Sequence, residues 1–544
     1  MQMLRRAWKP VIGTAVLVGA PSYVFYRWYY ARPSQESFDL QVRERGPDGK
    51  PAMLTRTFPL ISKDQADARL AAHAAFSSAT RPDGIVWKHA TAFLASNDPI
   101  EDANDSAIMQ RDAADPSAPG DLLFFAVMDG HAGPHTSRLL SKVLIPAVTL
   151  ELSSRLKAPP QPTFGQSLKS ILRPTASSSL PVDADPEHVT LALQTAFLNL
   201  DAELTNAPLQ LLAANLDKIA KETRAIPDLS QHPMAMASML PAMSGSCALL
   251  AMIDTAHSNL YVACTGDSRA VAGVYEESED GQGVWRVEVL SEDQTGRNPN
   301  ELKRLRSEHP PSEADVVIRN GRILGGLEPS RAFGDARYKW PREVQEVLSK
   351  AFFEGTDQPM RATPSLLKTP PYVTARPEVT HRKLSLPSAS SAADADVKPK
   401  STLRFLVLAT DGLWDELSSE DVVALVGGHL AGLRGRVPKS ALPALVRTTG
   451  GAPTVSGKDR APRRSAPSDG AWAFEDENVG THLIRNAFGG ADERRLRRLL
   501  SIPAPHARSY RDDVTVSVVW WEEGREGDAQ AAAVAAGGTV KAKL

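Results

Sequence analysis

LLFFAVMDGHAG, at residues 122–133, is the most informative stretch of this sequence. Its first seven residues are apolar and end at turn-forming residues, which is typical of a strand buried on both faces. The apolar run leads directly into Asp129, Gly130 and His131. An Asp-Gly pair after a strand is ordinarily a turn, because aspartate accepts turn hydrogen bonds and glycine tolerates a positive φ. Taken alone, the stretch predicts a buried strand followed by a turn.

Other apolar strands also border aspartates. RFLVLAT (404–410) leads into Asp411-Gly412, and Asp512-Asp513 directly precedes VTVSVVWW (514–521). Two more buried strands are predicted at CALLAMI (247–253) and NLYVACT (259–265), and amphipathic helices at 135–156 and 187–204. Strands that alternate with long amphipathic helices indicate a layered α+β or α/β core.

The aspartates at strand ends predict a metal site. Carboxylates at the same end of adjacent buried strands converge, and without a cation between them they would repel one another. Carboxylate oxygens are hard ligands, which favour Mg²⁺ or Mn²⁺ over zinc. Glu101 and Asp102 would supply further carboxylates ahead of the first strand.

The composition is that of a folded protein with a sizeable soluble core. The chain has 544 residues, 42% of them hydrophobic and 23% charged, with a formal net charge of −2. This near-neutral balance argues against a nucleic-acid-binding protein with a broad basic surface. The two cysteines, Cys247 and Cys264, cannot form a disulfide framework, which excludes a small secreted scaffold. Both lie in apolar runs and are expected to be buried thiols.

Residues 1–40 are predicted to be a mitochondrial targeting segment. The start of the chain is basic and its first acidic residue is Glu36, which is typical of a transit peptide. An uncharged run at 10–26 is flanked by aromatic residues and has the minimum length of a membrane-spanning helix. Two alternatives stay open here: a single anchoring helix, and a segment that is only removed on import.

The rest of the chain is predicted to form one catalytic domain over residues 41–521. Stretches rich in Pro, Ser, Ala or Gly predict flexible insertions near 157–186, 383–402 and 449–472. Residues 522–544 are predicted to be a disordered tail.

A series of motifs resembles, in order, the motifs of the metal-dependent PP2C (PPM-type) serine/threonine phosphatases. The series is Glu101-Asp102, FFAVMDGHAG (124–133), SGSCALL (244–250), TGDSRAV (265–271), PSRAFGD (329–335), LATDGLWD (408–415) and RDDVTV (511–516). Four stretches are similar to the mitochondrial pyruvate dehydrogenase phosphatase branch, in its fungal form: NDPIED (97–102), PSRAFGDARYKW (329–340), TPPYVTARPEV (369–379) and THLIRNAFGG (481–490).

The resemblance implies an α+β fold, a four-layer α-β-β-α sandwich with a binuclear Mg²⁺ or Mn²⁺ site at one end of the central β-sandwich. It implies that Asp129 bridges the two ions and that the Gly130 carbonyl completes one of the two shells. Asp411 and Asp512 would hold one ion directly, and Glu101 would hold the other, partly through water. Asp267, expected in a hairpin turn, matches a ligand of a weaker third metal. Two cations close together acidify a water and neutralise the phosphoryl oxygens, so that water hydrolyses the phosphate ester directly.

Two further residues have roles implied by the resemblance. His131 matches the family's general acid for the leaving serine or threonine oxygen, and the alternative is a histidine that only orients a metal ligand. Asn97 occupies the position where many members have an arginine that binds the substrate phosphate, and asparagine lacks that charged fork. Asp513 stands where many relatives have asparagine, and Cys247 replaces a hydroxyl residue.

The sequence thus predicts a metal-dependent protein serine/threonine phosphatase in mitochondria, in the matrix or anchored to the inner membrane. Its expected substrate is the phosphoserine of the pyruvate dehydrogenase α subunit, and no nucleic-acid partner is expected. One alternative is a general PP2C-type phosphatase that acts on other phosphoproteins. Another is a catalytically silent, membrane-tethered binding module, which would be expected to have lost metal carboxylates. This chain keeps Glu101, Asp129, Asp411 and Asp512.

Overall fold

The computed structural model describes most of the chain. The described residues are 36–45, 50–81, 84–110, 120–157, 184–216, 225–277, 283–355, 359–386, 401–450 and 470–523. The predicted anchoring run at 10–26, the middle of each predicted insertion and the predicted tail from 524 onward therefore lie outside them. Across the described ranges, every helix is too short or too polar to cross a bilayer.

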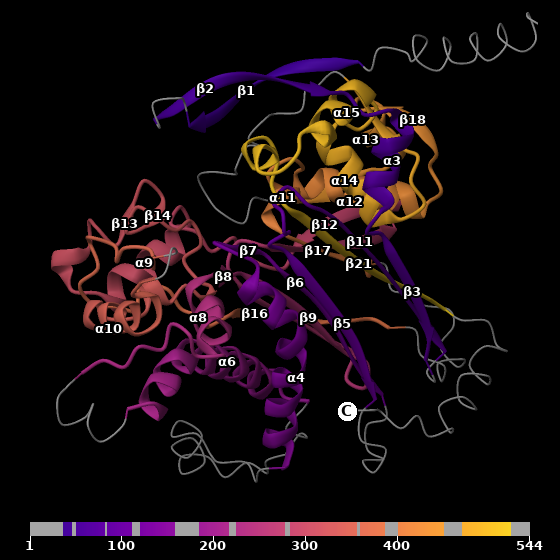
Figure 1. The fold of residues 1–544 in the computed structure, drawn as a ribbon. Helices are drawn as coiled ribbons and strands as arrows, with labels where there is room; N and C mark the ends of the chain where they lie inside the picture. Colours follow the sequence, from indigo (N-terminus) through magenta and orange to yellow (C-terminus); the bar gives the residue numbers. More distant parts are fainter. Residues whose placement is uncertain are drawn as a thin grey trace, which may run out of the picture.

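Two facing β-sheets form the centre of the molecule (Figure 1). One sheet has five antiparallel strands in the order β16-β10-β9-β6-β5, which are Glu378–Lys383, Asn259–Thr265, Ala248–Asp254, Asp121–Met128 and Ala103–Gln110. The other has seven strands in the order β19-β12-β11-β17-β21-β4-β3, which are Thr448–Gly450, Gly283–Val289, Arg269–Glu277, Ser401–Ala409, Val514–Glu523, Ile85–Leu94 and Ala75–Thr80.

Strand β6 shows why the two sheets stack. Successive side chains of a strand point to opposite faces, so its odd- and even-numbered residues separate into two cores. Leu123, Phe125 and Val127 pack between the two sheets. Phe124 and Met128 pack on the opposite face, against helices. The prediction of a strand buried on both faces is confirmed.

A helical layer covers the outer face of each sheet (Figure 1). The five-stranded sheet packs against α4 (His135–Lys157) and α6 (Pro186–Ala214). The seven-stranded sheet packs against α3 (Lys63–Ala71), α12 (Ser419–Leu430), α14 (Val479–Phe488) and α15 (Glu493–Ser501). The expected four-layer α-β-β-α arrangement is confirmed. Helix α6 starts where predicted, because Asp185 caps its N-terminus and Pro186 occupies the first turn, but it continues ten residues beyond the predicted end at 204.

The remaining elements surround this sandwich. A lobe beside α6 contains α8 (Ala235–Met243), α9 (Pro299–Glu308), α10 (Arg342–Phe353), β13 (Ile318–Arg319) and β14 (Arg322–Ile323), and is drawn on the left of Figure 1. Short elements are β7 (Gly130–His131), β8 (Gly245–Ser246), β15 (Phe333–Gly334), α11 (Asp411–Trp414), α13 (Leu442–Leu445), β18 (Gly435–Pro438) and β20 (Ala471–Phe474). An N-terminal hairpin joins β1 (Ser37–Arg45) to β2 (Pro51–Pro59), so regular structure begins inside the segment predicted for targeting.

One prediction of local topology is wrong. The TGDSRA segment that contains Asp267 was expected to be a hairpin turn, but it connects β10 to β11, which belong to different sheets. Strand β10 pairs with β9 and β16, whereas β11 pairs with β12 and β17. The segment is therefore a crossing between the two sheets, and it lies at the end of the sandwich where the other aspartates are found.

Candidate metal centre and active site

Three aspartates from distant parts of the chain meet at one end of the sandwich. Asp129 follows β6 of the five-stranded sheet, Asp411 begins α11 after β17 of the seven-stranded sheet, and Asp267 lies in the crossing between the sheets. One carboxylate oxygen of each lies within 4.8 Å of the others. The aspartates thus converge across the sandwich, with one contribution from each sheet and one from the connection.

The electrostatics of this group fit a divalent cation. Asp129 is half-buried, and burial together with the negative charges of Asp411, Asp102 and Asp267 raises its pKa well above the ordinary value. Within the described ranges, no lysine or arginine forms an ion pair with Asp129. Hard carboxylate oxygens that repel one another in a buried place are the donor set that Mg²⁺ or Mn²⁺ prefers.

Asp102 is a fourth carboxylate close to this group. It is 5% exposed and accepts a 2.9 Å hydrogen bond from the hydroxyl of Thr410, the residue that directly precedes Asp411 in the sequence. Burial and the nearby charge of Asp513 raise its pKa well above the ordinary value. It adds to the negative charge that a bound cation would neutralise.

Glu101 packs against the turn that follows Asp129. Its Oε1 accepts a 2.6 Å hydrogen bond from the Gly133 amide, and the Ser137 hydroxyl donates to its main-chain carbonyl. A Cβ at Gly130 would lie only 2.0 Å from that same carbonyl oxygen. Only a glycine at position 130 therefore allows the Glu101 segment to approach this closely.

Asp512 lies at the edge of the site rather than in the close group of three. It directly precedes β21, and its carboxylate pairs with Arg508 and accepts a 2.7 Å hydrogen bond from the Asp513 amide. A Cβ at Gly412 would lie 3.2 Å from the Asp512 Cβ, so Asp512 is next to the start of α11. Its role as a metal ligand stays a prediction.

Asp513 organises the loop that holds Glu101. Its Oδ1 accepts from the amides of Ser96 (2.6 Å) and Asn97 (3.0 Å), and its Oδ2 accepts from the Glu101 amide (2.9 Å). Burial alone would raise its pKa, but these donors lower it below the ordinary value. The sequence indicated this residue only as an aspartate in place of the family's asparagine, and its loop-organising role was missed.

Asn97 lies in the same loop. Its side-chain amide donates to Glu101 Oε2 at 3.1 Å and to Asp513 Oδ2 at 3.0 Å. Its amide hydrogens thus already have carboxylate acceptors within the chain. The predicted contact with substrate phosphate stays a prediction.

His131 contacts a carboxylate that the sequence did not single out. His131 Nε2 and Asp335 Oδ2 lie 2.6 Å apart, with side chains that are 20% and 7% exposed. Burial alone would lower the His131 pKa, but the charge and hydrogen bond of Asp335 raise it overall. Nearby, the Cys247 thiol donates to Asp267 Oδ1 at 3.2 Å, and both cysteines are buried as expected.

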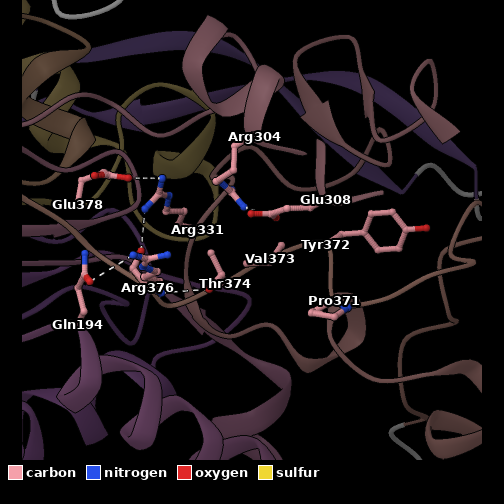
Figure 2. Close-up of a pocket in the computed structure, with 10 residues that line it drawn as sticks. All are labelled: Gln194, Arg304, Glu308, Arg331, Pro371, Tyr372, Val373, Thr374, Arg376 and Glu378. Atoms are coloured by element: carbon pink, nitrogen blue, oxygen red, sulfur yellow. Dashed lines mark hydrogen bonds and ion pairs between the residues drawn. The ribbon is translucent and has the colours of Figure 1, made fainter. Parts of the chain in front are cut away.

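A separate cavity of about 270 Å³ lies beside residues 371–378 (Figure 2). Arg331 in its wall is paired within the chain: its side chain contacts Glu378 at 2.7 Å and Glu301 at 2.6 Å. Burial would raise the Glu301 pKa, but hydrogen bonds from Arg331 and Arg304 lower it to about 2. The cavity is thus lined by an ion-pair network, and this network is distinct from the carboxylate centre.

Comparison with known proteins gives consistent matches. The family model described as Protein phosphatase 2C matches residues 185–434. A protein phosphatase 2C homologue of Schizosaccharomyces pombe is 36% identical over 449 residues, which cover 81% of this chain and 81% of that protein. The mitochondrial pyruvate dehydrogenase (acetyl-transferring) phosphatase 1 of Saccharomyces cerevisiae is 35% identical over 459 residues, which cover 80% of this chain and 69% of that protein. The human protein of the same name is 39% identical to this chain over 288 residues, which cover 51% of this chain and 48% of that protein.

Proposed function

Because this chain belongs to the protein phosphatase 2C family and is a protein serine/threonine phosphatase, we propose that it dephosphorylates and so reactivates the pyruvate dehydrogenase complex in mitochondria. The observation that supports the chemistry is the group of Asp129, Asp267 and Asp411, whose carboxylate oxygens lie within 4.8 Å of one another.

The residues of the centre would have different roles in metal binding. Asp129 would bridge two Mg²⁺ or Mn²⁺ ions, with Asp411 and Asp512 toward one ion and Glu101 toward the other, and the Gly130 carbonyl would complete one of the two shells. Asp267 would take part in a weaker third site. When bound, the ions supply an acidified water and neutralise charge on the phosphoryl oxygens.

Side chains of the protein orient the metal-binding loop and would protonate the leaving group. Asp513 holds the loop of residues 96–101 through three main-chain amides, so Glu101 has a fixed position. Asn97 lies in this loop and would contact the substrate phosphate. His131 follows directly after Gly130 and would donate a proton to the leaving serine or threonine oxygen, which is a poor leaving group as an alkoxide.

Two observations support the substrate. Two of the relatives described above are mitochondrial pyruvate dehydrogenase phosphatases by name. The basic, acid-poor start of this chain is typical of a mitochondrial transit peptide. The substrate would be the phosphoserine of the α subunit, and residues 1–40 would deliver the enzyme to the matrix or anchor it to the inner membrane.

The test compares substrates on the purified full chain. We expect kcat/KM to be at least tenfold higher on phosphorylated pyruvate dehydrogenase than on an unrelated phosphoserine peptide, with loss of both activities in EDTA and recovery with Mn²⁺. Equal kcat/KM on both would contradict the assigned substrate but leave the phosphatase assignment intact. In cells, deletion of the gene should increase phosphorylation of the α-subunit serines, as measured by phosphoproteomics.

Asp129→Asn tests the metal centre directly. It should abolish hydrolysis and weaken Mn²⁺ binding measured by calorimetry, while the circular dichroism spectrum stays unchanged. Asp254→Asn is the control, because Asp254 is a buried aspartate that lies at the far end of β9. Undiminished Mn²⁺ binding by Asp129→Asn would show that the metal centre is assigned wrongly.

A further inference from the structure

We propose that Asp335 is a positioning residue that holds the His131 ring in the orientation needed to protonate the leaving oxygen. This inference rests on the proposed function, in which His131 is the general acid. Asp335 is the last residue of the PSRAFGD motif, and 204 positions separate it from His131.

The contact leaves one ring nitrogen available. His131 Nε2 lies 2.6 Å from Asp335 Oδ2, so the carboxylate keeps a proton on Nε2. Within the part of the chain that the structure describes, Nδ1 has no hydrogen-bond partner. Nδ1 is therefore the nitrogen that can serve the substrate, and Asp335 fixes its direction.

The chemical step balances with this assignment. The water oxygen forms a bond to phosphorus as the bond from phosphorus to the serine or threonine oxygen breaks. The leaving oxygen keeps that bonding pair and takes the proton from Nδ1, while Nε2 keeps its proton toward Asp335. Solvent accepts one proton from the attacking water and returns one to the imidazole, so the net reaction consumes only water.

The main chain at Asp335 is held in an unusual conformation for this contact. Its φ of 48° and ψ of 35° are left-handed, a conformation that is uncommon for a residue other than glycine. The Asp335 amide donates to the Ser244 carbonyl at 3.0 Å, and the preceding Gly334 amide donates to the Asp201 carboxylate at 2.9 Å. Lys339 in turn donates to both Asp201 oxygens at 2.7 Å. The segment on both sides of Asp335 is thus fixed by buried polar contacts.

Gly245 leaves the space in which the two side chains meet. A Cβ at this position would lie 2.1 Å from His131 Nε2 and 2.3 Å from Asp335 Oδ2. Any larger residue would separate the pair. Strand β8, which contains Gly245, pairs with both β7 and β15, so it joins the two segments that contribute His131 and Asp335.

The chain also contains a matched pair for comparison. His257 Nδ1 and Asp254 Oδ2 lie 2.7 Å apart, and Asp254 is as buried as Asp335. That pair is at the far end of β9, about 20 Å of strand away from Cys247 and the carboxylate centre. It is an imidazole–carboxylate pair remote from the carboxylate centre.

The experiment uses Asp335→Asn in the full chain. Asparagine tolerates the left-handed conformation, so the variant removes the charge and keeps the main chain. Each variant is assayed with Mn²⁺ on a phosphoserine peptide, which needs leaving-group protonation, and on p-nitrophenyl phosphate, which leaves as a stabilised phenolate. We expect Asp335→Asn to lower kcat on the peptide by about 10- to 100-fold, with a several-fold smaller loss on p-nitrophenyl phosphate. Asp254→Asn should change neither.

Two additional measurements separate positioning from a structural role. The double variant His131→Asn, Asp335→Asn should be no slower on the peptide than His131→Asn alone, because both residues act in one step. Long-range ¹H–¹⁵N spectra of the metal-free protein should show the His131 proton on Nε2 in the wild type and a shifted tautomer equilibrium in Asp335→Asn.

The outcomes distinguish the two assignments. Equal losses on both substrates, multiplicative losses in the double variant, or an unchanged His131 signal would overturn the positioning role of Asp335. A His131→Asn variant with full peptide activity would instead overturn the general-acid role in the proposed function. If Asp335→Asn melts well below the wild type, Asp335→Glu, which keeps the charge, should restore the peptide rate relative to Asp335→Asn.

Discussion

Replacing Gly130 by alanine tests the closest contact in the metal centre. The added Cβ would lie 2.0 Å from the Glu101 carbonyl oxygen and 2.7 Å from the Ser137 hydroxyl, whereas ordinary contacts begin at about 3.4 Å. The first neighbour is main chain and cannot rotate away. The segments of Glu101 and Gly130 must therefore move apart by more than 1 Å.

The size of this displacement determines the expected loss of catalytic rate and of folding free energy. A misplacement of about 1 Å in a catalytic constellation costs on the order of 100-fold in rate, which corresponds to about 2.7 kcal/mol of transition-state stabilisation. Overpacking of a filled interior costs a further ~1–3 kcal/mol in folding free energy. Gly130→Ala should therefore lose about 100-fold in kcat/KM, bind Mn²⁺ more weakly and melt at a lower temperature.

The measurements are phosphopeptide hydrolysis at saturating Mn²⁺, calorimetric Mn²⁺ binding and thermal melting. Gly432→Ala is the control, since a Cβ there would meet no atom within 4 Å. Its φ of 84° makes alanine strained, so the control should lose about 1 kcal/mol of stability and no activity. A Gly130→Ala enzyme with wild-type kcat/KM and Mn²⁺ affinity would show that Glu101 and Gly130 do not act together.

Three further changes test the charges of the protein. Asp129→Asn should raise the melting temperature in EDTA, because burial and neighbouring negative charges disfavour its ionised form in the metal-free protein, and a lower melting temperature would contradict this. Arg508→Gln removes the ion-pair partner of Asp512, so Mn²⁺ should bind a few-fold more tightly in calorimetry, and an unchanged dissociation constant would show that Arg508 does not compete with the metal for Asp512. Burial lowers the pKa of His89 to about 4 and of His482 to about 3, so the unfolded state binds more protons than the folded state between these values and about 6.5. The free energy of unfolding in urea should thus fall as pH drops from about 6.5 to 4, by about 1.4 kcal/mol per pH unit for each histidine, and His89→Gln should show a shallower slope than the wild type.

The sequence predicted the centre of the fold well because its strands are continuous apolar runs. Strand β10 has the predicted bounds, and β6 and β21 differ from prediction by one or two residues at an end. Edge strands such as β5 alternate between exposed and half-buried positions, and nothing in ANDSAIMQ distinguishes such a strand from a loop. Burial on both faces leaves a signal in composition, whereas an edge position does not.

Pairing partners were harder to predict than strands. TGDSRA has the residues of a tight turn, and the local sequence alone favours a hairpin. Whether two consecutive strands pair or separate into facing sheets depends on the other strands, here β16 and β17, which are more than 100 residues away. The positions of Asp335 and Asp513 were missed for the same reason, because their partners are 204 and more than 400 residues distant.

The cross-sheet origin of the carboxylates links catalysis to the folding of the sandwich. Asp129 extends from one sheet and Asp411 from the other, so their repulsion in the metal-free protein acts across the interface that buries residues such as Val127 and Leu408. A cation that binds only the folded arrangement stabilises it by RT ln(1 + [L]/Kd), about 2.7 kcal/mol at a concentration 100 times Kd. An ion held by these carboxylates would therefore also stabilise the contact between the two sheets at this end of the sandwich. A variant that loosens the sheet interface should accordingly weaken Mn²⁺ binding even when every carboxylate is present.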